Sequence, residues 1–213
     1  MSKSFCNKKK VFNKIKKLNV RSGEKMYHIK DKEFIRGKVP MTKEEIRAVS
    51  IAKMEISDED VCIDIGGGTG SVSIEMARFA KNGHVYTIEQ KEEAVDLIKQ
   101  NMEKFEIKNM TVISGKAPED LPQGITFDKV FIGGSGGNLS EIINYSYENL
   151  KEGGIIALNF IVLENTFEAL ECLKKSKFED IDISQIIVVK NRKVKDFNMM
   201  MSENPIYVIS ARK

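Results

Sequence analysis

Glycines crowd into one short stretch of the chain, residues 66–70, where four of five positions are glycine. An apolar run, Val61 to Ile65, comes directly before this stretch, and a helix-like run follows it. Glycines in a turn between a strand and a helix permit positive φ angles and let a ligand approach the backbone without meeting a Cβ atom. We therefore predict that Gly66, Gly67, Gly68, Thr69 and Gly70 line a small-molecule site.

Two acidic residues frame this loop. Asp64 lies in the apolar run before the glycines, and Glu89 ends the next apolar run, about 20 residues beyond the loop. Taken alone, Asp64 could brace the loop and Glu89 could be a solvated strand end. Together with the glycines between them they favour a cofactor that carries a ribose, because a carboxylate at Glu89 can accept hydrogen bonds from both ribose hydroxyls.

The spacing of the glycines separates two classes of cofactor. The dinucleotide fingerprint G-x-G-x-x-G, started at Gly66, would require a glycine where Ser71 stands. The string DIGGGTG instead resembles the loop of class I S-adenosylmethionine-dependent methyltransferases, and in that fold the residues after the third strand flank the adenine, which indicates Ala117. A nicotinamide dehydrogenase, which could also use Glu89, is the less favoured alternative.

Short apolar runs alternate with amphipathic runs through the middle of the chain. The expected strands are 61–65, 84–88, 110–114, 127–132 and 154–160, and the expected helices are 71–80, 92–105, 139–150 and 166–174. An earlier helix should begin with Thr42 as N-cap, in a capping box with Glu45. Two β-rich runs, 183–190 and 205–211, close the chain with no helix between them. We predict an α/β fold, a Rossmann-like, doubly wound, mostly parallel seven-stranded sheet with a C-terminal antiparallel hairpin.

Positive charge is concentrated at one end of the chain. Residues 1–30 hold ten Lys or Arg and one acid, whereas residues 31–213 hold 24 basic and 30 acidic residues. We predict a basic N-terminal extension, partly disordered, over 1–30 and a single methyltransferase domain over 31–213. Basic tails can contact nucleic acid or membrane surfaces, but a lysine-rich run is common, and we assign this one no function.

The cysteines and the apolar runs limit the remaining classes. Cys6, Cys62 and Cys172 are scattered and lack the spacing of metal ligands, so we expect no disulfide framework and no metal site. This usage is typical of a reducing, cytoplasmic protein. No apolar run approaches the ~18 residues that a membrane helix needs, so we expect no membrane partner.

Four stretches of the chain resemble one family, the decarboxylating cobalt-precorrin-6B (carbon-15) methyltransferases of cobalamin (corrin) biosynthesis. The stretches are VPMTKEEIR (39–47), DIGGGTGSVSIEMA (64–77), FIGGSGG (131–137) and NPIYVISARK (204–213). The resemblance implies methylation at carbon-15 of a cobalt-precorrin coupled to loss of the acetate carboxylate, S-adenosylmethionine contacts from Thr42, residues 66–70, Glu89 and Ala117, and a homotetramer. Members often carry alanine or another small residue where Gly67 stands, and we expect the change to glycine in this chain to cost nothing sterically.

A corrin substrate carries acetate and propionate carboxylates, so its site needs cations although residues 31–213 are net acidic. Basic residues gather at 36–47 and at 190–195, while Gly133 to Gly137 could form a flat wall for a planar ring and Asn159 could hold the acetate. For any single basic residue, a role in solubility is equally plausible. Our candidate substrate-binding residues are Arg36, Lys43, Arg47, Gly134, Ser135, Gly136, Asn159 and Arg192.

We assign no catalytic residue, because a methyl group on a sulfonium is already activated and the enzyme chiefly aligns it. His28 and His84 are the only histidines, and we expect surface or packing roles for both. Two alternatives stay open: a protein isoaspartyl or tRNA-adenine methyltransferase, and a non-catalytic S-adenosylmethionine-binding module. The basic tail suits RNA, but the acidic body and the few aromatic residues argue against a nucleic-acid partner.

Overall fold

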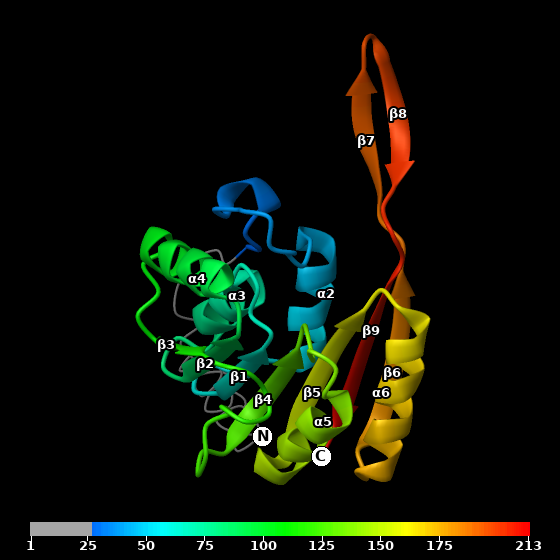
Figure 1. Ribbon diagram of the computed structural model, residues 1–213. Helices are drawn as coiled ribbons and strands as arrows, with labels where there is room; N and C mark the ends of the chain where they lie inside the picture. Colours follow the sequence, from blue (N-terminus) through cyan, green and yellow to red (C-terminus); the bar gives the residue numbers. More distant parts are fainter. Residues whose placement is uncertain (1–26) are drawn as a thin grey trace, which may run out of the picture.

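A seven-stranded sheet forms the centre of the computed structural model, which describes residues 27–213 (Figure 1). Its strand order is β3-β2-β1-β4-β5-β9-β6. The parallel strands are β1 (Val61–Ile65), β2 (His84–Glu89), β3 (Met110–Ser114), β4 (Phe127–Ile132) and β5 (Leu150–Phe160). Strand β9 (Ile206–Arg212) runs antiparallel to both β5 and β6 (Glu179–Ile186). The predicted fold class is confirmed.

Helices cover both faces of the sheet. On one face lie α2 (Glu44–Met54), α3 (Ser71–Phe79) and α4 (Glu92–Lys104), preceded by the short 3-10 helix η1 (Asp31–Glu33); on the other lie α5 (Leu139–Asn149) and α6 (Leu163–Lys175). Because the central strands are covered on both sides, they are almost continuously apolar. In β1, for example, Cys62, Ile63 and Ile65 are all buried. None of the helices within residues 27–213 combines the length and the apolar composition that crossing a membrane requires.

The chain reverses its direction across the sheet at β1. From β1 the chain moves outward through β2 to β3, and it then returns to place β4 on the other side of β1. In open α/β sheets, ligands bind outside the carboxyl ends of the strands at such a switch point. The fold therefore places Asp64, Glu89 and the glycine loop at the edge where a ligand is expected.

The start of α2 differs from the prediction. The helix begins at Glu44 with Lys43 as its N-cap, and the side chain of that residue makes no capping hydrogen bond. The expected capping box between Thr42 and Glu45 is wrong, because Glu45 instead forms an ion pair with Lys190, with 2.9 Å between Oε2 and Nζ. The carbonyl oxygen of Thr42 is held from inside the fold by Arg47.

The C-terminal hairpin is confirmed, but the segment between its strands is not a loop. Strands β7 (Val189–Val194) and β8 (Phe197–Ser202) pair in a separate two-stranded sheet that projects from the body (Figure 1). We call residues 189–202 the ribbon. Strand β6 therefore ends at Ile186, and Lys190, Arg192 and Lys193 belong to β7 rather than to a loop.

The N-terminal boundary of the domain stays a prediction. Residues 1–26 of the expected basic extension, including Cys6, lie outside the described residues. Of the remaining extension residues, Ile29 is buried in the cluster formed with α2, α3 and α4. Contacts with the folded body thus begin before residue 31.

Candidate active site

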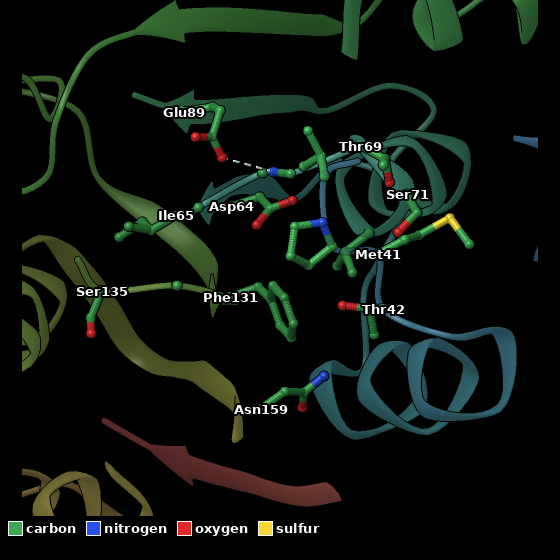
Figure 2. Close-up of a pocket in the computed structure, with 18 of the residues that line it drawn as sticks. Met41, Thr42, Asp64, Ile65, Thr69, Ser71, Glu89, Phe131, Ser135 and Asn159 are labelled. Carbon is green, nitrogen blue, oxygen red and sulfur yellow. Dashed lines mark hydrogen bonds between the residues drawn. The ribbon is translucent and has the colours of Figure 1, made fainter. Parts of the chain in front are cut away.

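A cavity of about 730 Å³ lies at the carboxyl ends of β1, β2, β4 and β5 (Figure 2). Its walls come from segments that are far apart in the sequence: the stretch before α2, the glycine loop, the loop after β4 and the chain after β5. The predicted site residues that line it are Thr42, Lys43, Asp64, Gly66, Gly67, Gly68, Thr69, Glu89, Ala117, Gly134, Ser135, Gly136 and Asn159. Most of the predicted site is therefore brought together in one place.

The glycine loop packs tightly against its surroundings. Gly66 has φ +82°, and a Cβ atom there would lie 2.7 Å from the backbone nitrogen of Gly134, so the loops after β1 and β4 touch through bare backbone. At Gly67 a Cβ atom would lie 2.4 Å from Thr87 Oγ1. Glycine therefore fits at position 67 of this chain, whereas alanine would require a shift, because the Thr87 side chain already fills that space.

Glu89 is fixed at the end of β2 by two backbone groups. Its Oε2 accepts a hydrogen bond of 3.0 Å from the Gly68 N–H (dashed in Figure 2), and its Oε1 accepts one of 3.0 Å from the Lys91 N–H. Each carboxylate oxygen has a second lone pair, so both can still accept a hydrogen bond from a ligand. The carboxylate is positioned in advance for a pair of hydroxyl groups.

Asp64 is buried beneath the cavity with half of its carboxylate unpaired. Its Oδ2 accepts a hydrogen bond from Ser73, whereas its Oδ1 is buried without a hydrogen-bond partner. Burial raises the pKa of Asp64 to about 7; the hydrogen bond from Ser73 opposes this increase, and the charge of Glu89 adds to it. A buried, unsatisfied oxygen is costly, and a cationic donor bound in the cavity would remove that cost.

The far side of the cavity is formed by the loop after β4 and the end of β5. Gly134, Ser135 and Gly136 leave a wall with few side chains, beside the ring of Phe131 (Figure 2). Asn159 Nδ2 lies 2.9 Å from Ser50 Oγ of α2, which braces its amide at the cavity edge. This half of the cavity therefore combines nearly bare backbone after β4 with the amide of Asn159.

Four predicted site residues do not line the cavity. Gly70 precedes α3 and packs against Ile98 of α4, so its role is in the turn. Arg36 is exposed outside the lining, and Arg192 is exposed on the ribbon. The structure contradicts the placement of Arg47, which is 0% exposed because it lies on the inner face of α2 and bonds Glu75.

Sequence reasoning missed a group of lining residues at the open side of the cavity. They include Met41, Phe131, Phe160, Ile161, Val162, Val188, Glu203 and Asn204. Part of this group could have been predicted from the sequence. Because β9 is antiparallel to β5, its amino end must reach the edge of the sheet where the ligand binds. Glu203 and Asn204 lie directly before that end.

A comparison with families of known proteins matches residues 33–213 to the precorrin methyltransferase domain. The chain belongs to this family. A relative from Saccharolobus solfataricus, named a probable cobalt-precorrin-6B C(15)-methyltransferase (decarboxylating), is 40% identical over 178 residues, which cover 82% of this chain and 89% of the relative. The predicted enzyme class, a methyltransferase, is thereby confirmed for this member of the precorrin methyltransferase family, and a non-catalytic module is not favoured.

Two solved structures agree with this assignment. A precorrin-6y C5,15-methyltransferase from Geobacter metallireducens superposes with a TM-score of 0.82 at 37% identity, covering 87% of this chain and 97% of the other. A precorrin 8w decarboxylase from Methanobacterium thermoautotrophicum superposes with a TM-score of 0.81 at 36% identity, covering 86% and 98%. The precorrin methyltransferase family thus accounts for nearly the whole of the described chain, and the protein- and tRNA-methylating alternatives are not favoured.

Proposed function

We propose that this protein transfers the methyl group of S-adenosylmethionine to carbon-15 of a cobalt-precorrin and releases the acetate carboxylate of the ring as carbon dioxide. One observation carries the proposal: a single cavity combines a polar half, built around Asp64 and Glu89, with an open, side-chain-poor half. The name of the Saccharolobus solfataricus relative supports the reaction and the substrate.

The residues of the polar half fit S-adenosylmethionine. The unpartnered Asp64 Oδ1 suits the ammonium group of the methionine part, and the fixed carboxylate of Glu89 suits the two ribose hydroxyls. Backbone at Gly66 to Thr69 would run alongside the cofactor, with Thr42 on the facing wall and Ala117 beside the adenine. Glycine at position 68 keeps the loop close to the opposite wall, since a Cβ atom there would lie 3.0 Å from the Pro40 carbonyl oxygen.

The open half fits a large ring with carboxylate arms. Phe131, Phe160 and Val162 supply apolar contacts, and the glycines after β4 leave room for a planar macrocycle. Lys43 lines the cavity and is the cation that we assign to a ring carboxylate. Ser135 and Asn159 add hydrogen-bonding groups, of which Asn159 would hold the acetate that is lost.

The bound cofactor supplies an activated methyl group. The residues of the chain therefore have to align the donor with the ring and shield the reacting carbon from water, and they need not activate the methyl group. The walls at Thr42 and at the glycine loop orient the donor, and the apolar residues of the open half exclude water from the reacting carbon. An acetate carboxylate placed among Phe160, Val162 and the amide of Asn159 loses hydration, which favours its departure as carbon dioxide. The conjugated ring accepts the electron pair. No general base is required.

The direct test measures both products. Purified protein is supplied with S-adenosylmethionine and a cobalt-precorrin-6B labelled with ¹³C in the ring acetate carboxylate, and the products are followed by mass spectrometry. We expect equal amounts of S-adenosylhomocysteine and labelled carbon dioxide, and a Glu89→Gln variant should lose most of the activity at limiting cofactor. Formation of neither product by the native enzyme would overturn the proposal.

We further propose that the protein is a cytoplasmic homotetramer. The ribbon supports an assembly, because Phe197 and Met200 are 73% and 64% exposed on a two-stranded sheet that is separate from the seven-stranded sheet. Exposed apolar residues on an unpaired sheet are typical of an interface between subunits. The buried free thiols of Cys62 and Cys172 suit the reducing cytoplasm.

A further inference from the structure

Residues 28–35, which we call the strap, are bonded to buried polar side chains of three helices. Arg47 comes from α2, Glu75 from α3 and Asn101 from α4, and their exposed fractions are 0%, 1% and 0%. Buried charged and amide groups are costly unless each is paired. Three such groups that converge on one short segment mark the strap as a specifically built contact.

The first link joins the strap to the wall of the cavity before α2. Arg47 donates from Nη1 to the Thr42 carbonyl oxygen (2.6 Å) and to Asp31 Oδ1 (3.2 Å), and from its other terminal nitrogen to the Ile29 carbonyl oxygen. Its Nε donates to Glu75 Oε1 (2.8 Å), which also accepts from the Ile29 N–H (3.1 Å). One guanidinium thus ties two strap residues to the backbone of a residue that lines the cavity.

The second link joins the strap to the glycine loop. Asn101 Oδ1 accepts from the Ile35 N–H (2.8 Å), and its Nδ2 donates to the carbonyl oxygens of Ile35 (3.0 Å) and Thr69 (3.0 Å). Thr69 also lines the cavity, and it belongs to a different segment of the chain from Thr42. The two segments come close to one another near Gly68 and Pro40, so the strap is bonded to both segments of the part of the cavity assigned to the cofactor.

We propose that the strap is a brace coupled to the cofactor, and that Arg47 and Asn101 are positioning residues that set the separation between Thr42 and Thr69. This inference rests on the proposed function. Neither side chain lines the cavity, so both act through the backbone of residues that do. Coupling between two sites is reciprocal. Loosening the strap should therefore weaken cofactor binding, and bound cofactor should tighten the strap.

The first test compares the same substitution at two asparagines. Asn101→Asp keeps the acceptor for the Ile35 N–H and loses both donated bonds. Asn109→Asp is the control, since Asn109 also donates to two backbone carbonyls, of Ala77 (3.0 Å) and Ala80 (2.7 Å), but it lies away from the strap and the cavity. Calorimetry with S-adenosylhomocysteine should show roughly tenfold weaker binding for Asn101→Asp and native binding for Asn109→Asp. Arg47→Lys, which keeps the charge but cannot reach four partners, should resemble Asn101→Asp.

Turnover adds a readout that a purely structural defect would not give. Asn101→Asp should raise KM for S-adenosylmethionine while KM for the corrin and kcat at saturating cofactor stay native. Equal losses in Asn101→Asp and Asn109→Asp would overturn the inference.

The second test uses the native protein and does not depend on the stability of a variant. Amide hydrogen exchange at Ile29 and Ile35, whose N–H groups are bonded to Glu75 and Asn101, should slow when S-adenosylhomocysteine is added. If the native protein binds S-adenosylhomocysteine but these amides exchange at an unchanged rate, the coupling is wrong and the proposed function stands. If the native protein binds no S-adenosylhomocysteine or S-adenosylmethionine, the proposed function fails first, and the coupling fails with it.

Discussion

The hydroxyl of Ser73 donates a hydrogen bond to Oδ2 of Asp64, and this leaves Oδ1 as the only carboxylate oxygen of Asp64 without a partner. Ser73 is itself anchored, since its Oγ lies 3.1 Å from Thr87 Oγ1 of β2. The carboxyl group is therefore held in place, buried and half satisfied. Its environment disfavours the charged form of the carboxyl group as long as no cation is bound beside it.

The first prediction concerns the stability of the ligand-free protein as a function of pH. The pKa of Asp64 is raised from 3.8 to about 7 in the folded chain, so the native state binds more protons than the unfolded state between these values. The contribution of this group to stability is present below about pH 4 and is lost as the pH rises through about 7. Asp64→Asn should therefore raise the free energy of unfolding at pH 8 by roughly 4 kcal/mol, and by much less at pH 4, as measured in urea.

Binding of the cofactor should show the opposite dependence on pH. A cationic ammonium group favours ionised Asp64, which becomes populated as the pH rises toward and above 7. The affinity of the native protein for S-adenosylmethionine should therefore increase between about pH 6 and pH 7.5, whereas that of Asp64→Asn should be weaker and nearly constant. An equally steep increase in Asp64→Asn would show that another group controls binding.

The next prediction concerns the contact beneath the glycine loop. Gly67→Ala places a methyl group 2.4 Å from the present position of Thr87 Oγ1, so Thr87 or the loop must move. We expect a loss of about 1–3 kcal/mol in unfolding free energy. Thr87→Ala removes the obstructing atoms, and the double variant should lose less than the sum of the two single variants. Strictly additive losses would mean that the loop, rather than Thr87, takes up the strain.

The sequence predicted the parts of this molecule in which local pattern and burial agree. The bounds expected for β1 and β4 match the structure, because a strand that is covered on both faces appears as a short apolar run between turn residues; the bounds of β3 match as well, although it is a partly exposed edge strand. The cofactor half of the site could be predicted for the same reason. Asp64 and Glu89 lie at or next to the carboxyl ends of two neighbouring parallel strands, and these ends must meet at one edge of the sheet.

Long-range pairing decided the parts that were mispredicted. Arg47 was predicted to bind the substrate, but Glu75 and the strap pack against α2 and pair with its guanidinium inside the fold. The ribbon carries charged and methionine residues with no clear alternation, and its pairing depends on Lys195 taking a φ of +55° at the turn. Neither feature can be deduced from a local window of the sequence.

The ribbon yields a prediction about assembly. If Phe197 and Met200 are covered by other subunits, replacing both with serine exposes no new apolar surface in the monomer but weakens the interface. Light scattering should give a tetramer for the native protein and a smaller species for the double variant. Asp196→Asn, at the exposed turn of the same ribbon, is the control and should stay tetrameric. A native protein that is monomeric at micromolar concentration would contradict the proposed assembly.

Binding of the corrin provides the last prediction. Lys43 lines the cavity, whereas Lys38, in the same basic cluster, is exposed outside its lining. Removal of a cation that pairs with a ring carboxylate should cost about 1.5–3 kcal/mol, so Lys43→Met should raise KM for the corrin by at least about tenfold. Because the donor contacts lie elsewhere, kcat and the affinity for S-adenosylhomocysteine should change little, and Lys38→Met should behave as the native enzyme does. If Lys43→Met instead weakens S-adenosylhomocysteine binding and leaves KM for the corrin intact, Lys43 belongs to the cofactor half of the cavity, and the ring carboxylates must be held by other groups.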